Sequence, residues 1–164
     1  MRKILPTVMT MICLGGHSLM AAEDPKTLPP EMYQVMESGK SLGKVFVDPA
    51  YDKAKGFKLG SVDYRADTKI SAVLEGLNRS MGMLTKSESP FTLNLVITKV
   101  TTGFKLLRKH VRGRLTIEGA IVDAKGKVVA AFTTMEPAGK IGADVDNYQI
   151  ACDAIATAIS KDLL

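Results

Sequence analysis

Alternating apolar and polar residues predict strands through the middle of the chain. Over residues 91–98, apolar side chains fall at every second position, a period typical of a strand with one face in the core. The alternation is lost at Lys99, so we expect the strand to end or bulge there. Two more strands are predicted over 111–122 and 128–135, joined by a turn in which Gly126 can take a positive φ.

Two segments show the three- and four-residue spacing of amphipathic helices. The first covers residues 67–84, and Asp67 is expected to be its N-cap. The second is expected to begin at Asp146, with Gln149 placed to complete a capping box. The two apolar stripes contain Ile70, Val73, Leu74, Leu77, Met81 and Leu84, and then Tyr148, Cys152, Ile155 and Ile159.

A short apolar run predicts a first strand over residues 43–48, which Pro49 ends. Residues 50–66 fit either a second short strand or an ordered loop. The resulting order is β-α-β-β-β-α, and the first helix allows the first two main strands to pair in parallel through a right-handed crossover. We therefore expect an α/β (α+β) two-layer sandwich, with a mixed sheet of about four strands backed by two helices.

Residues 1–22 have the three parts of a secretory signal peptide. Arg2 and Lys3 form a positive start, residues 4–14 are mostly apolar, and small residues precede an expected cleavage site after Ala22. The apolar run is too short to cross a membrane as a helix. A lipoprotein is the less favoured alternative, because Cys13 lies inside the apolar run and follows a large residue.

We expect residues 23–42 to be a linker and residues 43–164 to be a single α/β domain. Within the linker, Met32, Val35 and Met36 allow one short helical turn, and a mobile tether is the alternative.

Composition and charge narrow the compartment and the partners. The formal net charge is +5, and it is +3 without the leader's Arg2 and Lys3, which is too weak to indicate nucleic acid. Removal of Cys13 with the leader would leave Cys152 with no cysteine to pair with. Export without a disulfide is typical of the bacterial periplasm, where we expect the protein to be found.

Several short motifs do not develop into a catalytic or metal site. The Gly-Lys-Ser at 39–41 lacks the first glycine of a phosphate-binding loop and precedes a strand. Ser41 and Lys44 match Ser-x-x-Lys without the partner motifs of penicillin-binding enzymes. His110 is the one histidine after the leader, and Cys152 is expected to lie in the core. We predict no catalytic residue, no metal site and no cofactor.

Four aspartates could supply a carboxylate pair for glycan hydrolysis, but nothing in their spacing makes them converge. We expect two of them to stabilise turns and one to cap a helix. These residues are Asp48, Asp52, Asp63 and Asp67.

The most distinctive feature is a basic segment at 105–114, with five positive charges and no acid in ten residues. Such a segment suits phospholipid headgroups, lipopolysaccharide phosphates, acidic glycans or an acidic protein face. A charged strand edge that discourages aggregation is an equal alternative. The candidate contact residues are Lys105, Arg108, Lys109, Arg112 and Arg114.

The order and texture of the elements resemble small bacterial envelope domains, many of them lipoproteins, related to the N-terminal domain of the curli-secretion lipoprotein. The resemblance implies a non-enzymatic envelope component that works through contacts or assembly. We therefore expect an accessory protein that contacts an envelope protein or an anionic polymer, with a peripheral membrane contact left open. A lipid or small-ligand carrier is the alternative, and a cell-wall glycan hydrolase is less favoured. The resembling pieces are Lys44–Asp48, Ile70–Leu84, Phe91–Ile97, Gly113–Gly119, Ile121–Gly126 and Tyr148–Leu163.

Overall fold

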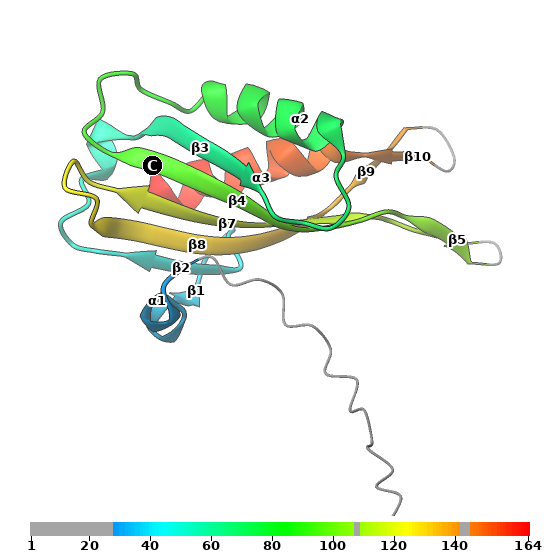
Figure 1. Ribbon diagram of the computed structural model, residues 1–164, viewed down its shortest axis with the longest axis horizontal. Coiled ribbons are helices and arrows are strands. Elements are labelled where there is room, and N and C mark those ends of the chain that lie inside the picture. The colour runs from blue at the N-terminus through cyan, green and yellow to red at the C-terminus, as the bar shows by residue number, and fades with distance from the viewer. Residues whose placement is uncertain (1–27, 107–108, 142–144) are drawn as a thin grey trace, which may run out of the picture.

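Six strands pair into one mixed sheet in the order β1-β2-β8-β7-β4-β3 (Figure 1). The computed structural model describes residues 28–106, 109–141 and 145–164. The sheet strands are β1 (Glu37–Ser38), β2 (Lys44–Val47), β3 (Lys58–Tyr64), β4 (Thr92–Thr101), β7 (Arg114–Val122) and β8 (Val128–Pro137). The remaining elements are α1 (Pro30–Val35), η1 (Lys53–Lys55), α2 (Ser71–Gly82), β5 (Phe104–Leu106), β6 (Lys109–Val111), β9 (Gly139–Ile141), β10 (Val145–Asn147) and α3 (Tyr148–Leu163).

The predicted α/β sandwich is confirmed, but the sheet is larger than four strands and one strand pair was assigned wrongly. The parallel partner of β4 is β3, whereas β2 pairs antiparallel with β8. A crossover helix joins the strand just before it to the strand just after it, and β3 is the strand that precedes α2. The segment 50–66, whose sequence fits either a strand or an ordered loop, contains this strand.

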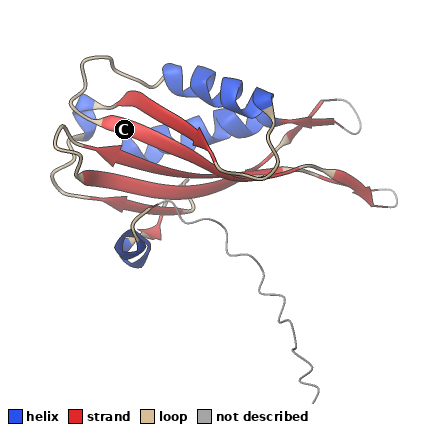
Figure 2. Cartoon of the chain, in the orientation of Figure 1, coloured by secondary structure: helices blue, strands red, loops and turns tan. Residues whose placement is uncertain are grey.

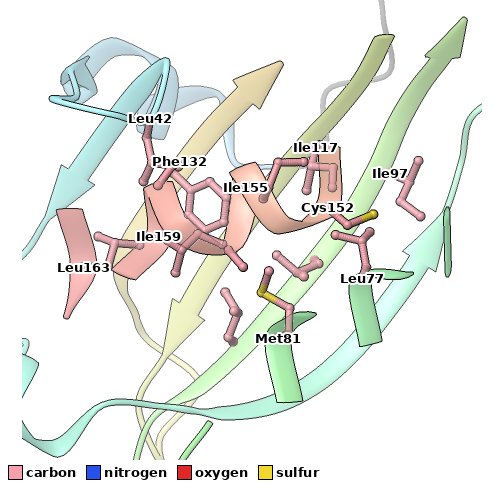
Figure 3. Close-up of a cluster of buried hydrophobic side chains, with 14 of the residues drawn as sticks. Leu42, Leu77, Met81, Ile97, Ile117, Phe132, Cys152, Ile155, Ile159 and Leu163 are labelled. Carbon is pink, nitrogen blue, oxygen red and sulfur yellow. The ribbon is translucent and has the colours of Figure 1, made fainter. Parts of the chain in front are cut away.

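Helices α2 and α3 cover one face of the sheet (Figures 1 and 2). Figure 3 shows the side chains between them, with Leu77 and Met81 from α2, Ile155 and Ile159 from α3 and Phe132 from the sheet in one cluster. All five side chains have no solvent exposure. The hydrophobic stripes predicted for the two helices therefore face the core.

The two helices approach closely at Gly76. A Cβ there would lie 3.0 Å from Oε1 of Gln149 and 3.1 Å from Sγ of Cys152, both on α3. The sulfhydryl of Cys152 lies 3.7 Å from the carbonyl oxygen of Val73. Gly76 thus serves helix–helix packing.

Helix α1 packs on the opposite face of the sheet (Figure 1). Leu28 and Met36 are buried there against Ala131 of β8. The hydroxyl of Tyr33 donates a hydrogen bond to Oε2 of Glu118 at 2.8 Å. Of the two alternatives for this part of the linker, the helical turn is the one found over 30–35. The division at residues 22 and 42 stays a prediction.

Both predicted helix caps were assigned to the wrong residue. Helix α2 begins at Ser71, after Ile70, and has no side-chain cap. Asp67 lies before it, exposed to solvent. Helix α3 begins at Tyr148, and the side chain of Asn147 accepts the hydrogen bond from the backbone N–H of Gln149 at 3.0 Å. Asp146 is occupied elsewhere, as described below.

The local turns and breaks mostly follow the sequence prediction. The pairing of β4 with β7 shifts register between Ile97 and Lys99, which confirms the bulge, although β4 continues to Thr101. Gly126 has a φ of +80° in the β7–β8 turn. The strand predicted over 111–122 is broken, because β6 ends at Val111 and β7 begins at Arg114.

Candidate functional site

The basic segment forms a β-hairpin that projects from the end of the sheet (Figures 1 and 2). Strands β5 and β6 pair antiparallel, with Phe104 opposite Val111 and Lys105 opposite His110. They continue the paired strands β4 and β7, in which Thr101 lies opposite Arg114. The candidate contact is therefore a structural unit that stands away from the core.

The structure places four of the five predicted contact residues on this hairpin or at its root. Lys105, Arg112 and Arg114 are exposed to solvent. Lys109 begins β6, and Arg108 lies outside the described residues. The guanidinium of Arg114 lies 4.0 Å from the sulfur of Met135 on β8.

Two apolar residues of the hairpin were not recognised as part of the candidate site. Phe104 is 56% exposed and Val111 is 40% exposed. They are direct cross-strand partners, so their side chains stand on the same face of the hairpin. The sequence shows that Phe104 precedes Lys105. Only the strand pairing of the hairpin places Val111 beside Phe104.

Asp146 anchors the root of the hairpin. Its carboxylate accepts hydrogen bonds from the backbone N–H of Gly103 and, at 3.2 Å, from that of Gly113. The hydroxyl of Tyr148 donates to the carbonyl of Thr101 at 2.8 Å. Asp146 lies on β10 and Tyr148 begins α3, so a second hairpin and a helix hold the first one.

The packing at this root leaves no room for a side chain at Gly113. A Cβ there would lie 2.4 Å from the carbonyl oxygen of Thr101 and 2.7 Å from Oδ2 of Asp146. Burial, together with the negative charge of Asp146 and the neighbouring Tyr64, raises the pKa of Tyr148 to about 12. The Tyr148 hydroxyl therefore remains a hydrogen-bond donor at neutral pH.

Two of the four candidate carboxylates, Asp48 and Asp52, have structural roles. Asp48 accepts from the backbone N–H of Ala50 and pairs with Lys127 at 2.8 Å. The hydrogen bond from Lys127 holds the pKa of Asp48 below its usual value, which does not suit a general acid. Asp52 caps η1 through the backbone N–H of Ala54. The expected turn role is confirmed for these two, whereas Asp67 caps no helix and both Asp63 and Asp67 are exposed.

The Gly-Lys-Ser loop binds an anion that belongs to the chain itself. The backbone N–H groups of Ser41 and Leu42 donate to Oδ2 of Asp162, at 3.0 and 2.9 Å. A Cβ at Gly39 would lie 2.7 Å from the same oxygen. The loop is thus filled by a carboxylate from α3.

Buried side chains from the sheet and from both helices pack between the two layers. Pockets of about 650, 380 and 340 Å³ at the surface of the described part of the chain are lined in part by charged residues such as Lys55, Glu75 and Asp153. Cys152 is buried, and burial raises the pKa of its thiol to about 12. Within the described ranges no three His, Cys, Asp or Glu side chains gather for a metal ion. In those ranges no helix is long and apolar enough to cross a membrane.

No protein-family model matches the chain, and no curated protein sequence matches it. Among solved structures it is similar to the PelC dodecamer from Paraburkholderia phytofirmans, at 14% identity and a TM-score of 0.47 over 73% of this chain and 97% of that one. It is also similar to a lipoprotein from Neisseria meningitidis, at 12% identity and a TM-score of 0.34 over 64% and 99% of the two chains. A minor lipoprotein from Acinetobacter baumannii shows 18% identity and a TM-score of 0.33 over 63% and 89%. The expected resemblance to bacterial envelope lipoproteins is confirmed at this distant level.

Proposed function

We propose that this chain is an exported, non-enzymatic accessory protein of the bacterial cell envelope, and that its basic hairpin contacts an anionic partner. The observation that carries the proposal is the position of the hairpin, which projects from the sheet: Lys105 is exposed on it, and Arg112 and Arg114 are exposed at its root. The described residues of β5 and β6 include no acid. Cations exposed on a projecting element attract anionic surfaces.

The attachment of the hairpin to the rest of the fold supports a role in binding a partner. A charged edge that only prevents aggregation needs no fixed orientation, whereas this hairpin is tied by Asp146 and Tyr148 to β10 and α3. Its partner is an envelope protein or an anionic envelope polymer.

Export follows from the signal-peptide pattern at 1–22, and the periplasm is the proposed compartment. The test is the intact mass and fractionation of the protein made with its own leader in a Gram-negative host. A soluble periplasmic species that begins at Glu23 supports the proposal. A membrane-bound species that begins at a diacylated Cys13 makes the protein a lipoprotein and contradicts the proposed cleavage after Ala22.

The contact itself is tested by replacing Arg108, Lys109 and Arg112 with Ser. We expect thermal stability to stay almost unchanged and binding to an anionic polymer such as alginate, or to an acidic envelope protein, to be lost. Unchanged binding per folded molecule would contradict the role of the hairpin.

A further inference from the structure

The hairpin displays apolar side chains next to its cations. Phe104 and Val111 are cross-strand partners and are 56% and 40% exposed. Exposing an aromatic ring and a branched aliphatic side chain together costs hydrophobic free energy that a core position would recover. Exposed apolar pairs on a projecting element often mark an interaction surface.

Along the chain, each residue of this apolar pair is followed by a cation. Lys105 follows Phe104 on β5, and Arg112 follows Val111 at the end of β6. Neighbouring side chains in a strand point to opposite faces, so the hairpin has an apolar face at Phe104 and Val111 and a cation on the other face at Lys105. All four residues are exposed.

This combination distinguishes between the anionic partners. A soluble acidic glycan offers charges to the cations and a sugar face to one ring, but no apolar layer that takes up Phe104 and Val111 together. The surface of a bilayer offers anionic headgroups to the cations and, a few ångströms deeper, an apolar layer to the ring. An aromatic side chain with nearby Lys and Arg is a composition that favours this interface.

We infer that the β5–β6 hairpin is a lipid-binding element that docks on bilayers containing anionic phospholipids, with Phe104 and Val111 entering the interface. This inference rests on the proposed function of the hairpin as the contact site, and it names the partner. The contacts of Asp146 with Gly103 and Gly113 fix the angle at which the hairpin leaves the sheet.

The chain contains no tryptophan, so Phe104→Trp gives a fluorophore that reports on the hairpin alone. The variant is mixed with phosphatidylcholine vesicles that contain one quarter phosphatidylglycerol, and with vesicles of phosphatidylcholine only. We expect a blue shift of the Trp emission, and quenching by brominated acyl chains, with the anionic vesicles. The matched control is Met83→Trp, at a residue 74% exposed after α2, which should show neither change.

Co-sedimentation of the protein without the added Trp then measures affinity. Combining Lys105→Gln, Arg112→Gln and Arg114→Gln should weaken partitioning on anionic vesicles roughly 100-fold, at roughly fivefold for each cation. Phe104→Ser should weaken it roughly tenfold through lost burial of the ring.

The control for charge replaces three exposed lysines away from the hairpin, Lys44, Lys58 and Lys125, with Gln. It should bind the vesicles at least tenfold more tightly than the hairpin triple variant. Melting curves of all variants confirm that they are folded.

Three results are decisive. Binding to anionic vesicles that falls in both the charge variant and Phe104→Ser supports the inference. Binding to alginate that ignores Phe104→Ser, with no binding to vesicles, overturns the lipid partner and leaves the proposed function standing. No binding to vesicles, combined with capture of an acidic envelope protein through the hairpin, also overturns the lipid partner.

Discussion

Asp162 is expected to hold the N-terminal part of the described chain onto α3. The residue is 9% exposed, and its carboxylate accepts hydrogen bonds from the backbone N–H groups of Ser41 and Leu42 at 3.0 and 2.9 Å. Nζ of Lys53 donates to the backbone carbonyl of the same residue. The other carboxylate oxygen, Oδ1, is buried and has no hydrogen-bond partner among the described residues. Replacing Asp162 therefore removes a contact between segments 120 residues apart.

The magnitude follows from these contacts. A hydrogen bond to a charged group contributes about 1.5–3 kcal/mol. Asp162→Ala removes two such hydrogen bonds, and it also removes the buried Oδ1 that has no partner, which offsets part of the loss. We therefore expect the free energy of unfolding to fall by about 2–4 kcal/mol. At about 2–4 °C per kcal/mol for a chain of this size, the melting temperature should fall by roughly 5–15 °C. Asp162→Asn keeps an acceptor and loses the charge, so its loss should be about 1–2 kcal/mol.

The same contact predicts a pH dependence. Burial by itself would raise the pKa of Asp162, but the N–H groups of Leu42, Ser41 and Lys40 and the charge of Lys40 outweigh burial and lower it below 3.8. The folded state then favours the ionised form, so the stabilisation is complete above the unfolded pKa and is lost as the pH falls through the folded pKa. The gap between the native protein and Asp162→Asn should narrow in that acidic range.

Urea unfolding followed by circular dichroism, at pH 7 and at pH 2.5, measures both effects. The control is Lys161→Ala, an exposed neighbour on α3, which should change the free energy of unfolding by less than about 0.5 kcal/mol. The reasoning is refuted if Asp162→Ala costs no more than this control at pH 7. It is also refuted if the gap to Asp162→Asn is as wide at pH 2.5 as at pH 7.

Four further outcomes are expected. Gly113→Ala forces a Cβ against the backbone and should lower the free energy of unfolding by about 1–3 kcal/mol. Asp146→Ala should make the hairpin root cleavable by trypsin while α3 stays protected. A hairpin root as well protected in this variant as in the native protein would contradict the role of Asp146 as anchor. Lys127→Ala should raise the pKa of Asp48, because the hydrogen bond that lowers it is lost, and an unchanged NMR titration would contradict the pairing. Cys152 should react with a thiol reagent only in denaturant, which mass spectrometry of its labelled peptide can check, and labelling of the native protein would contradict its burial.

Local sequence patterns were sufficient to predict secondary structure and its buried face where these depend on nearby residues in the sequence. The period of two over 91–98 and the helical stripes ending at Leu84 and Ile159 placed β4, α2 and α3 with their core faces inward. The bulge near Lys99 was also visible, because it shifts the alternation of apolar residues. These features follow from the periods of helix and strand, which operate over a few residues.

The candidate site was only partly visible. The basic segment was found from charge alone, but Asp146 was assigned as a helix cap because it precedes a helical stripe, and its carboxylate instead anchors Gly103 and Gly113. Asn147, one residue later, has the extended backbone of a cap and takes that role. Two adjacent residues with the same capping ability cannot be separated by local pattern.

The sequence by itself determined the strands β2, β4 and β8, the helices α2 and α3 with their buried faces, the sandwich class and the charge of the segment at 105–114. Only the tertiary structure decided that β3 rather than β2 pairs in parallel with β4, that Asp162 fills the loop at Ser41, and that Phe104 stands beside Val111. The physical reason is the range of the interactions. Periodic burial is imposed residue by residue along the chain, whereas strand partners and buried carboxylates are chosen by segments that meet only after the chain has folded.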